Sequence, residues 1–313
     1  MKRILIFLIG LFLFFTSFRT EAQQYPVYSQ YLFNPLVINP AYAGSHVQFS
    51  ATVMYRNQWV NLDGAPRTTS LTMHSTLGIP SVGIGAIITN DKIGSYSNTS
   101  MYGHYAYRLR MPTGTLSMGL QAGFNLVSAD YSDLNLNDLN DASFISFSNK
   151  IRPNFGAGMY YDSKKFYAGF SVPFILNTSI SSNLESFITE LREARYYYLH
   201  GGAFINLNPQ GTAIIHPSVL VRAQEGQPLS MDMNLDFILN EVFSIGASYR
   251  NIDAIITYMS LKLSDQFHFG YSYDWTQSDL NQFSKGSHEF MLNYRFRIRK
   301  FHGNVECPSF YEH

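Results

Sequence analysis

Apolar and polar residues alternate along many short segments of this chain. In residues 114–127, Leu116, Met118 and Leu120 alternate with Ser117, Gly119 and Gln121. Because successive side chains of a β-strand point to opposite faces, such a segment is a strand with one apolar and one polar face. The same alternation, with Phe, Tyr, Met and Leu on the apolar face, returns in residues 230–239, 242–250, 266–275 and 287–298. The pattern therefore predicts a sheet whose two faces meet different surroundings.

Fourteen segments can be interpreted in this way, and each is close to the ~9–11 residues with which a tilted strand crosses a bilayer. The predicted strands are 48–57, 66–76, 81–89, 95–110, 114–127, 153–162, 165–172, 194–206, 212–222, 230–239, 242–250, 254–263, 266–275 and 287–298. The segments 81–89 and 254–263 alternate less regularly. The pattern is thus also compatible with twelve or sixteen strands.

The connections between these segments alternate in length. Every second connection is short and contains turn-forming residues, as in Met111–Thr113, Asn240–Glu241 and Ser264–Asp265. The longest connections, Ser128–Arg152 and Pro173–Glu193, fall in the other set, although that set also has short members near residues 90–94 and 251–253. Short turns on one side and longer loops on the other are typical of bacterial membrane barrels. A soluble β-sandwich gives no reason for this regularity.

The composition fits a membrane barrel. Charged residues make up 14% of the chain, below the ~25% of soluble domains, and aromatic residues reach 16%. An apolar outer face with aromatic girdles explains both values. The net charge of zero gives no basic surface for nucleic acid, and the single cysteine, Cys307, excludes an internal disulfide. We therefore predict an all-β, transmembrane antiparallel β-barrel of about 14 strands in the outer membrane of a Gram-negative bacterium.

The N-terminus has the parts of a secretory signal. Lys2 and Arg3 precede an apolar run over residues 4–15, and Thr20-Glu21-Ala22 offers a cleavage site before Gln23. The run is shorter than the ~20 residues that a spanning helix needs, although an uncleaved anchor is the alternative. We expect residues 1–22 to be the signal peptide, 23–47 a periplasmic or luminal arm, 48–299 the barrel and 300–313 a C-terminal tail.

Sites for metal or catalysis are weakly supported. Asp130, Asp133, Asp138 and Asp141 crowd one long loop, but the glycine and the final glutamate of a calcium loop are missing, so we favour a solvated polar loop. Neither a His-Glu-x-x-His helix nor a Gly-x-Ser-x-Gly elbow occurs. We predict no metal, no cofactor and no enzymatic activity, with a barrel hydrolase of scattered residues as the weakest alternative.

Two features of the sequence are compatible with either an open or a filled lumen. The polar faces could line an open pore or fill a packed interior, and glycines on the inward face would make room inside the barrel. Residues 182–195 combine capping-box spacing at Ser182 and Glu185 with apolar residues at helical spacing, which predicts a short helix. That helix could be a lid, a plug or a docking element, or it could only pack on the barrel rim.

The segment after the signal, QQYPVYSQYLFNPLVINPAYAG over residues 23–44, closely resembles the opening of the PorP/SprF family of Bacteroidetes membrane proteins. Three further segments agree: YRNQW at 55–59 with DGAP at 63–66, VGIGA at 82–86 with NDKIG at 90–94, and NFGAG at 154–158. The resemblance covers nearly all of the mature chain and is weakest after Arg299. It implies an outer-membrane barrel that works with the type IX secretion machinery and helps export or attach a large surface protein, often an adhesin, with a link to gliding motility.

The resemblance also suggests where a partner would bind. The predicted partner-binding residues are Asn34, Pro35, Asn39, Pro40, Tyr42 and Gly44 in the opening motif, and Arg56, Gln58, Trp59, Asp63 and Gly64 near the first outer loop. The expected partners are the type IX machinery, a secreted surface protein and outer-membrane lipid, with no nucleic acid and no small-molecule substrate. The alternative function is a general porin or solute channel.

Physical chemistry bears on the same residues. In Asn34-Pro35 and Asn39-Pro40, a turn-forming asparagine precedes a proline with fixed φ, so we expect a bent, largely extended arm in the lumen or along the periplasmic rim. Such an arm could serve only to close the barrel floor. Trp59 beside Arg56 could likewise be an interfacial aromatic with a guanidinium contact rather than a partner contact.

Overall fold

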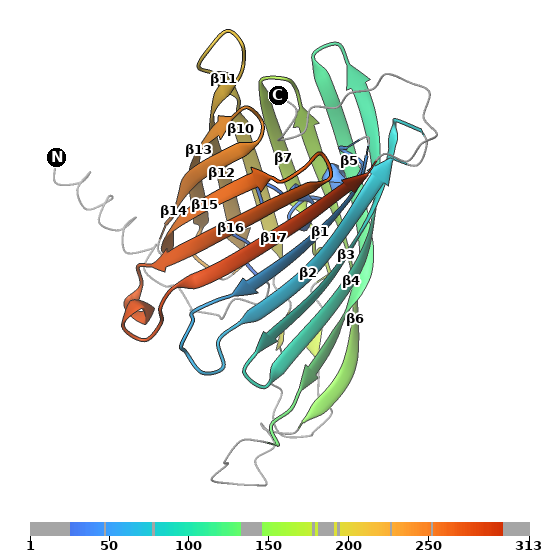
Figure 1. The fold of residues 1–313 in the computed structure, drawn as a ribbon. Coiled ribbons are helices and arrows are strands. Elements are labelled where there is room, and N and C mark those ends of the chain that lie inside the picture. Colours follow the sequence, from blue (N-terminus) through green and yellow to red (C-terminus); the bar gives the residue numbers. More distant parts are fainter. Residues whose placement is uncertain are drawn as a thin grey trace, which may run out of the picture.

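The protein is a closed antiparallel β-barrel of fourteen long strands (Figure 1). The computed structural model describes residues 26–46, 48–76, 79–132, 146–176, 179–180, 191–192, 195–225, 227–251 and 253–296. The barrel strands are β1 (Phe49–Asn57), β2 (Arg67–Thr76), β3 (Val82–Ile93), β4 (Tyr96–Met111), β5 (Gly114–Ala129), β6 (Phe147–Asp162), β7 (Phe166–Val172), β10 (Tyr196–Ala203), β12 (Ala213–Gln224), β13 (Ser230–Leu239), β14 (Phe243–Arg250), β15 (Ala254–Lys262), β16 (Phe267–Thr276) and β17 (Ser287–Phe296).

Each long strand pairs with its neighbours in the chain, and β1 pairs with β17 to close the ring. The short strand β11 (Ile205–Asn206) extends the wall by pairing with β12, whereas β8 (Ser179–Ile180) pairs with β9 (Leu191–Arg192) in a separate two-stranded sheet. The loop between β16 and β17 holds a single 3-10 turn, η4 (Asp279–Gln282). Closure of the ring pairs the first barrel strand with the last, and such pairing is how strands satisfy their backbone groups in a membrane.

The predicted strands are confirmed, and most of their ends agree within two or three residues. The clearest difference is β6, which begins at Phe147 rather than at 153 because its first residues continue the pairing with β5 through a register shift between Val127 and Ala129. Strand β3 also runs on to Ile93, past the predicted end at residue 89. The polar residues near the end of β3 interrupt the apolar alternation, so the sequence pattern did not predict this extension.

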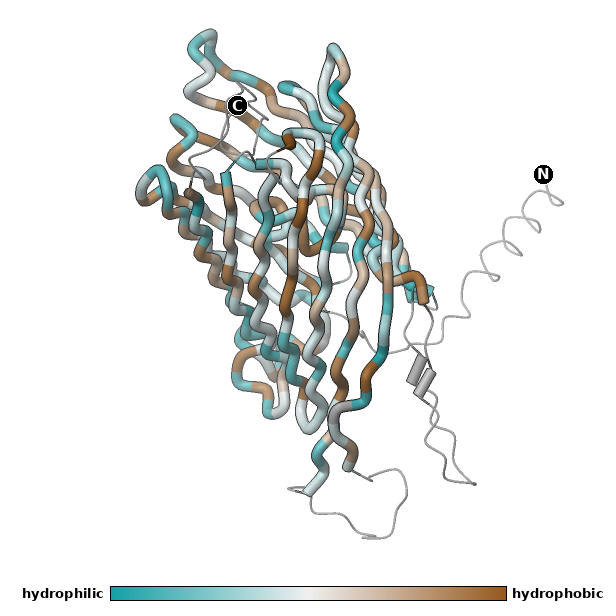
Figure 2. The backbone as a smooth tube through the Cα atoms, turned by 90° about the vertical axis from the view of Figure 1, so that its right-hand side faces the viewer, coloured by the Kyte–Doolittle hydropathy of each residue, from teal (hydrophilic) through white to brown (hydrophobic). Residues whose placement is uncertain are grey.

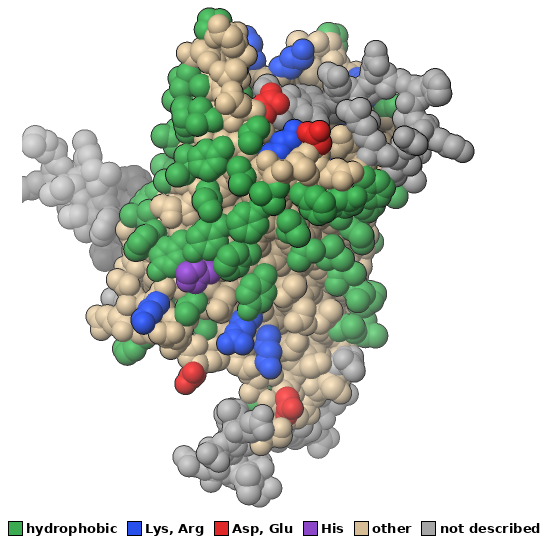
Figure 3. Space-filling view, viewed as in Figure 1, with side chains coloured by type: hydrophobic (Ala, Val, Ile, Leu, Met, Phe, Trp, Pro, Cys, Tyr) green, Lys and Arg blue, Asp and Glu red, His purple; other side chains and the backbone are tan. Residues whose placement is uncertain are grey.

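The two faces of the wall divide as the alternation predicts. Outward side chains are apolar and exposed, as at Leu120, Ile151 and Leu235, whereas inward side chains such as Asn125, Asp232 and Glu289 are fully buried. Hydrophobic and hydrophilic residues alternate along the strands in Figure 2. In Figure 3 hydrophobic side chains gather over the middle of the visible wall, and charged side chains lie towards its two ends. This apolar band is the surface that meets lipid hydrocarbon.

The two ends of the barrel differ. One end carries the loops that follow β1, β5, β7 and β16; we call it the long-loop mouth, and it lies at the bottom of Figure 1. The other end carries short connections and we call it the turn mouth. There Asn240 and Glu241 both have positive φ, the backbone of a tight hairpin turn, as predicted for this pair. Because bacterial barrels keep their short turns in the periplasm, the long-loop mouth faces the outside of the cell.

The N-terminal arm, described over residues 26–46, lies inside the barrel. Its two Asn-Pro pairs each begin a single 3-10 turn, η1 (Pro35–Val37) and η2 (Pro40–Tyr42). Proline suits the first position of such a turn because its φ is already helical and its missing N–H has no partner there. The arm therefore lies in the lumen. It forms two 3-10 turns, whereas we expected a bent but largely extended chain.

Several predicted features lie wholly or partly outside the described residues. These are the signal peptide over 1–22, the tail over 300–313 and most of the acidic loop. The helix predicted over 182–195 also falls there for the most part, and at Leu191 and Arg192 the structure has strand β9 in place of a helix. Among the described residues, no helix is long and apolar enough to span a bilayer.

Candidate functional site

The first anchor of the arm lies at the long-loop mouth, where a carboxylate holds two backbone amides. The N–H groups of Ser29 and Gln30 donate to the two carboxylate oxygens of Glu289, each over 2.9 Å. The Gln30 side chain also donates to the backbone carbonyl of Glu289 over 2.9 Å. The Ser29 hydroxyl donates to Asp274, and the guanidinium of Arg56 donates to that hydroxyl over 2.8 Å. Hydrogen bonds to ionised groups are the stronger kind, so this anchor holds the arm firmly.

A buried network of ion pairs surrounds this anchor. Arg56 pairs with Asp274 at 2.6 Å and with Glu289 at 3.0 Å. Next to it, Asp232 accepts from both Arg250, at 2.9 Å, and Arg222, at 3.0 Å. Their side chains are at most 9% exposed. Arginine and carboxylate charges thus balance one another inside the lumen, which is the condition under which buried charges are tolerated.

The middle of the arm is held by side chains on both sides of the barrel. Asn34 donates to the Thr72 hydroxyl on β2 over 2.9 Å, and Tyr31 accepts from Asn234 on β13 over 2.7 Å. The ring of Phe33 packs edge-on against Tyr258 with ring centroids 5.9 Å apart. A cluster of buried apolar residues forms around these contacts. The arm therefore crosses the lumen and packs against side chains from opposite walls of the barrel.

The second Asn-Pro pair is fixed by β6, β7 and β10. The Asn39 side chain accepts from the Ala41 N–H over 3.0 Å and caps η2, as asparagine does at a helix start. Its amide donates to the Met159 carbonyl over 2.9 Å, and it lies 3.3 Å from a ring nitrogen of His200. The Ser171 hydroxyl donates to the Ile38 carbonyl over 2.5 Å. One side chain thus shapes the turn and also ties it to the wall.

The arm ends at the turn mouth. The Gly44 N–H donates to a ring nitrogen of His74 over 3.3 Å, and Arg108 donates to the Gly44 carbonyl. Tyr42 packs between aromatic neighbours, with ring centroids 5.5 Å from Tyr160 and 5.6 Å from His74. His46 stacks on His74 at 5.2 Å, just before the chain enters β1.

Glycines of the barrel wall stand where the arm passes very close to the strands. A side chain at Gly83 on β3 would collide with the backbone of Ala43 and Gly44, and one at Gly119 on β5 would collide with Pro40 and Ala41. The prediction that inward glycines make room inside the barrel is thereby confirmed, and the occupant of that room is the arm. Complementarity of this kind favours one fixed seat over a loosely held segment.

The first outer loop, residues 58–66, is tied to both neighbouring connections. The Val60 N–H donates to the Gly286 carbonyl and the Val60 carbonyl accepts from Lys285, each over 2.8 Å. The Gly64 carbonyl accepts from Gly94 over 2.9 Å on the other side. Asp63 and Gly64 are exposed, and Gln58 and Trp59 are half-buried. The loop therefore presents a fixed surface at the long-loop mouth.

The predicted partner-binding residues thus fall into two places. The six of the arm, Asn34, Pro35, Asn39, Pro40, Tyr42 and Gly44, lie in the lumen, and Gln58, Trp59, Asp63 and Gly64 lie in the outer loop. Arg56 was expected near the outer loop with Trp59, but it is an inward residue of β1 that pairs with acids. Its guanidinium is engaged there because alternation turns it away from the surface.

Sequence reasoning missed the residues that hold the arm. Ser29, Gln30, Asp274 and Glu289 were not among the predicted site residues, although Asp274 and Glu289 lie on predicted polar faces. Asp274 and Glu289 could have been found from their positions, because each is an inward charged residue near the long-loop end of its strand. Charges at one depth in a barrel lumen must neutralise one another or contact a plug.

Among the described residues, no cluster of His, Cys, Asp and Glu could hold a metal ion. Of the acidic loop, Asp130 is described, and it accepts from the Ser132 hydroxyl over 2.7 Å and from its N–H over 3.0 Å. These hydrogen bonds lower the pKa of the Asp130 carboxyl. The remaining aspartates of that loop lie outside the described residues.

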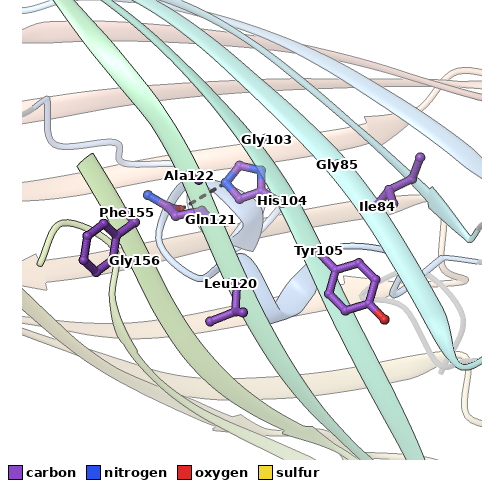
Figure 4. A pocket seen from close by; sticks show the side chains of 10 residues that line it. All are labelled: Ile84, Gly85, Gly103, His104, Tyr105, Leu120, Gln121, Ala122, Phe155 and Gly156. Carbon is purple, nitrogen blue, oxygen red and sulfur yellow. Dashed lines mark hydrogen bonds between the residues drawn. The ribbon is translucent and has the colours of Figure 1, made fainter. Parts of the chain in front are cut away.

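A hollow of about 610 Å³ lies in the wall formed by β3 to β6 (Figure 4). Its outer rim consists of Ile84, Tyr105, Leu120 and Phe155 around the small residues Gly103 and Ala122. On the inward side of the same strands, His104 and Gln121 form a hydrogen bond of 3.1 Å (Figure 4). The rim is part of the lipid-facing band, so the hollow fits hydrocarbon better than a polar substrate.

Comparison with known proteins finds one family and several distantly similar structures. The family model described as "Type IX secretion system membrane protein PorP/SprF" matches residues 20–294. Solved structures similar to this one include the outer membrane protein Omp33 of Acinetobacter baumannii, with a TM-score of 0.47 at 9% identity, covering 81% of this chain and 100% of that one. Others are KdgM porin, with a TM-score of 0.38 at 8% identity over 79% and 99% of the two chains, and a mutant of Rh. blastica porin, with 0.36 at 6% over 80% and 99%.

These structural similarities are distant, and no curated protein matches the chain. The fold is established by the strand pairing itself, and the family by a model that covers most of the sequence. The barrel fold places the protein in the outer membrane, and the family associates it with type IX secretion. The chain belongs to the PorP/SprF family of type IX secretion system membrane proteins.

Proposed function

We propose that this barrel helps to export or attach a large surface protein, adhesin-like in kind, and that it does so as a binding component and not as a channel or an enzyme. The family association with type IX secretion supports the general role. The observation that carries the finer proposal is the seated arm, which fills the lumen from wall to wall. A barrel with a filled lumen suits docking at its rim better than passage through its centre.

In this proposal the first outer loop is the contact surface. Val60 and Gly64 are hydrogen-bonded to the two neighbouring connections, and the Trp59 N–H donates to Ser287 of β17, so the loop loses little conformational entropy when a partner binds. The loop lies at the long-loop mouth, where a secreted protein outside the cell can reach it. Rigid surfaces that carry an aromatic residue are typical of protein interfaces.

The arm residues have a different place in the proposal. Asn34, Asn39 and Tyr42 are at most 5% exposed, so a partner can touch them only if the arm leaves its seat. We propose that they hold the plug and that the plug supports the mouth through Ser29 and Glu289. Direct partner contact by the arm stays a prediction of the resemblance.

The test is made in cells that lack the gene and carry it on a plasmid. Asp63→Arg together with Trp59→Ala is expected to remove the dependent protein from the cell surface, while the barrel still assembles and keeps its heat-modifiable mobility. The matched control is Asp265→Arg, a change of the same charge in an exposed turn at the other mouth. Normal surface display in the loop variant would overturn the assignment of the contact surface.

The general porin is the competing function. An inward face rich in serine, asparagine and charged residues would suit a water-filled lumen, but here those residues bind the arm. The two functions differ in what purified protein does in a planar bilayer. Large, stable conductance from the intact protein would favour the porin.

A further inference from the structure

We propose that the N-terminal arm threads the whole lumen, so that Pro26 at its start lies at the outer face of the membrane while β1 begins at the periplasmic face. The proposal concerns the path of the chain and does not depend on the role in secretion. It also names a surface, because residues at the start of the arm then lie where an extracellular protein can bind them.

The first step is the depth of the arm's beginning. Ser29 contacts Arg56, which is one residue before the end of β1, and Glu289, which is the third residue of β17. The long first loop follows Arg56, and the long β16–β17 connection precedes Glu289. Asp274, the third partner, is two residues before the end of β16. All three contacts therefore place Ser29 just below the long-loop mouth.

The second step is the depth of the arm's end. Gly44 lies against Gly83, which is the second residue of β3, and against Ser75, which is one residue before the end of β2. Between these two strands lies a short connection of the turn mouth. Gly44 is also bound by Arg108, which approaches the end of β4 at the same mouth. The chain then enters β1 at Phe49, where the strand begins.

The third step is the order of contacts between the two ends. Asn34 bonds to Thr72 in the middle part of β2, and Asn39 bonds to the Met159 carbonyl, closer to the turn end of β6. Contact depth thus moves in one direction from Ser29 to Gly44. The arm makes a single passage through the lumen and does not double back, so its two ends lie at opposite mouths.

The last step assigns the mouths to the two sides of the membrane. In bacterial barrels the short turns are periplasmic and the longer loops are extracellular. The start of the arm is therefore on the cell surface. A chain that reaches the outer membrane from the periplasm must therefore carry the start of the arm outward as the barrel forms around it. The anchor for it lies at the seam, because Arg56 on β1 and Glu289 on β17 are direct register partners.

The partner that this surface fits is a protein outside the cell. Pro26 and Val27 are half-buried, so the chain at this point is leaving the packed lumen for the mouth that also carries the first outer loop. An extracellular partner can engage both without entering the membrane. A periplasmic partner would instead meet the other end of the arm, near Ser45 and His46, and the short turns.

The experiment uses single cysteines in the full-length protein with Cys307→Ser, displayed in its own cells and treated with a membrane-impermeant maleimide. Pro26→Cys reports the start of the arm. Asp63→Cys, in the exposed first outer loop, is the control for the cell surface, and Asp265→Cys, in an exposed short turn, is the control for the periplasm. Retained heat-modifiable mobility verifies that each variant is folded.

We expect Pro26→Cys to be labelled in intact cells, as Asp63→Cys is, while Asp265→Cys reacts only after the outer membrane is permeabilised. Labelling of Pro26→Cys only after permeabilisation would overturn the proposal. Where that variant does not fold, an epitope inserted directly before Pro26 gives the same decision: antibody binding to intact cells supports threading, and binding only to permeabilised cells refutes it.

Discussion

Arg56 on β1 and Glu289 on β17 are direct partners across the seam that closes the barrel, and both also bind Ser29 of the arm. The pair is 3.0 Å apart, and neither side chain is more than 3% exposed. Closure of the ring and seating of the plug therefore share one set of hydrogen bonds. A change at this position is expected to affect both.

Glu289→Gln tests this coupling. The amide keeps the size of the side chain but removes the negative charge, so Arg56 loses one of its two acids and the Ser29 and Gln30 amides lose a carboxylate acceptor. Breaking a buried ion pair in this way costs about 3–5 kcal/mol. We expect a lower temperature for loss of heat-modifiable mobility. The control is Glu225→Gln, whose pair with Arg195 is exposed and is worth about 0–1 kcal/mol; equal effects would contradict the coupling.

Gly119→Ala tests the fit between the wall and the arm. Its methyl group would collide with the backbone of Pro40 and Ala41, so the arm must shift or the strand must bend. Overpacking of this kind costs about 1–3 kcal/mol. Gly103→Ala on the adjacent strand is the control, because its methyl group would point to the lipid side with no atom closer than 3.9 Å. Thermal unfolding in detergent measures both, and an unchanged Gly119→Ala midpoint would argue against a tightly seated arm.

The strands were predictable because successive side chains of a barrel strand point alternately to lipid and to the lumen, so apolar and polar residues alternate in the sequence. Leu120 and Gln121, for example, are lipid-facing and luminal as their alternation predicts. The poorly alternating segment at 81–89 is also understandable now. Gly83 and Gly85 stand at inward positions where the neighbouring parts of the arm and wall leave no room for a polar side chain.

The site was less predictable, because it depends on contacts between strands far apart in the chain. Asp274 and Glu289 could be assigned to the polar face, but their meeting with Arg56 follows from the register of β1, β16 and β17. The seat of Asn39 likewise needs side chains from β6 and β10. The Asn-Pro pairs predicted a bend in the arm, whereas only the assembled lumen decides how deep the arm lies.

Leu120→Arg tests the lipid-facing band. Leu120 is 62% exposed on the outer wall, at the hollow between Tyr105 and Phe155. An arginine near the bilayer midplane costs about 2–4 kcal/mol in a barrel. We expect less folded protein in membranes and slower refolding into lipid vesicles. Asp63→Arg puts the same side chain in an exposed loop, where it should leave refolding unchanged; a similar loss there would show that the added charge, and not its depth, is responsible.

Asn39→Ala with Tyr42→Ala tests whether the arm contributes to partner attachment. The first change removes the cap of η2 and the bond to Met159, and the second removes the ring that packs between Tyr160 and His74. We expect the barrel to keep its heat-modifiable mobility and the dependent surface protein to be lost. The control pair, Asn90→Ala with Tyr249→Ala, makes the same changes at exposed positions of the wall. Normal surface display in the arm variant would remove the arm residues from the site.

The closed state of the lumen can be measured as ion conductance in a planar bilayer. We expect little current from the intact protein, because the arm packs against both sides of the barrel. Ser29→Pro with Gln30→Pro removes the two N–H donors to Glu289 without altering the wall, so the first anchor weakens and current should rise. Val27→Pro is the control, two residues before the anchor. Equal currents from the intact and double-proline proteins would mean that the arm does not close the lumen, and a large stable current from both would favour the porin.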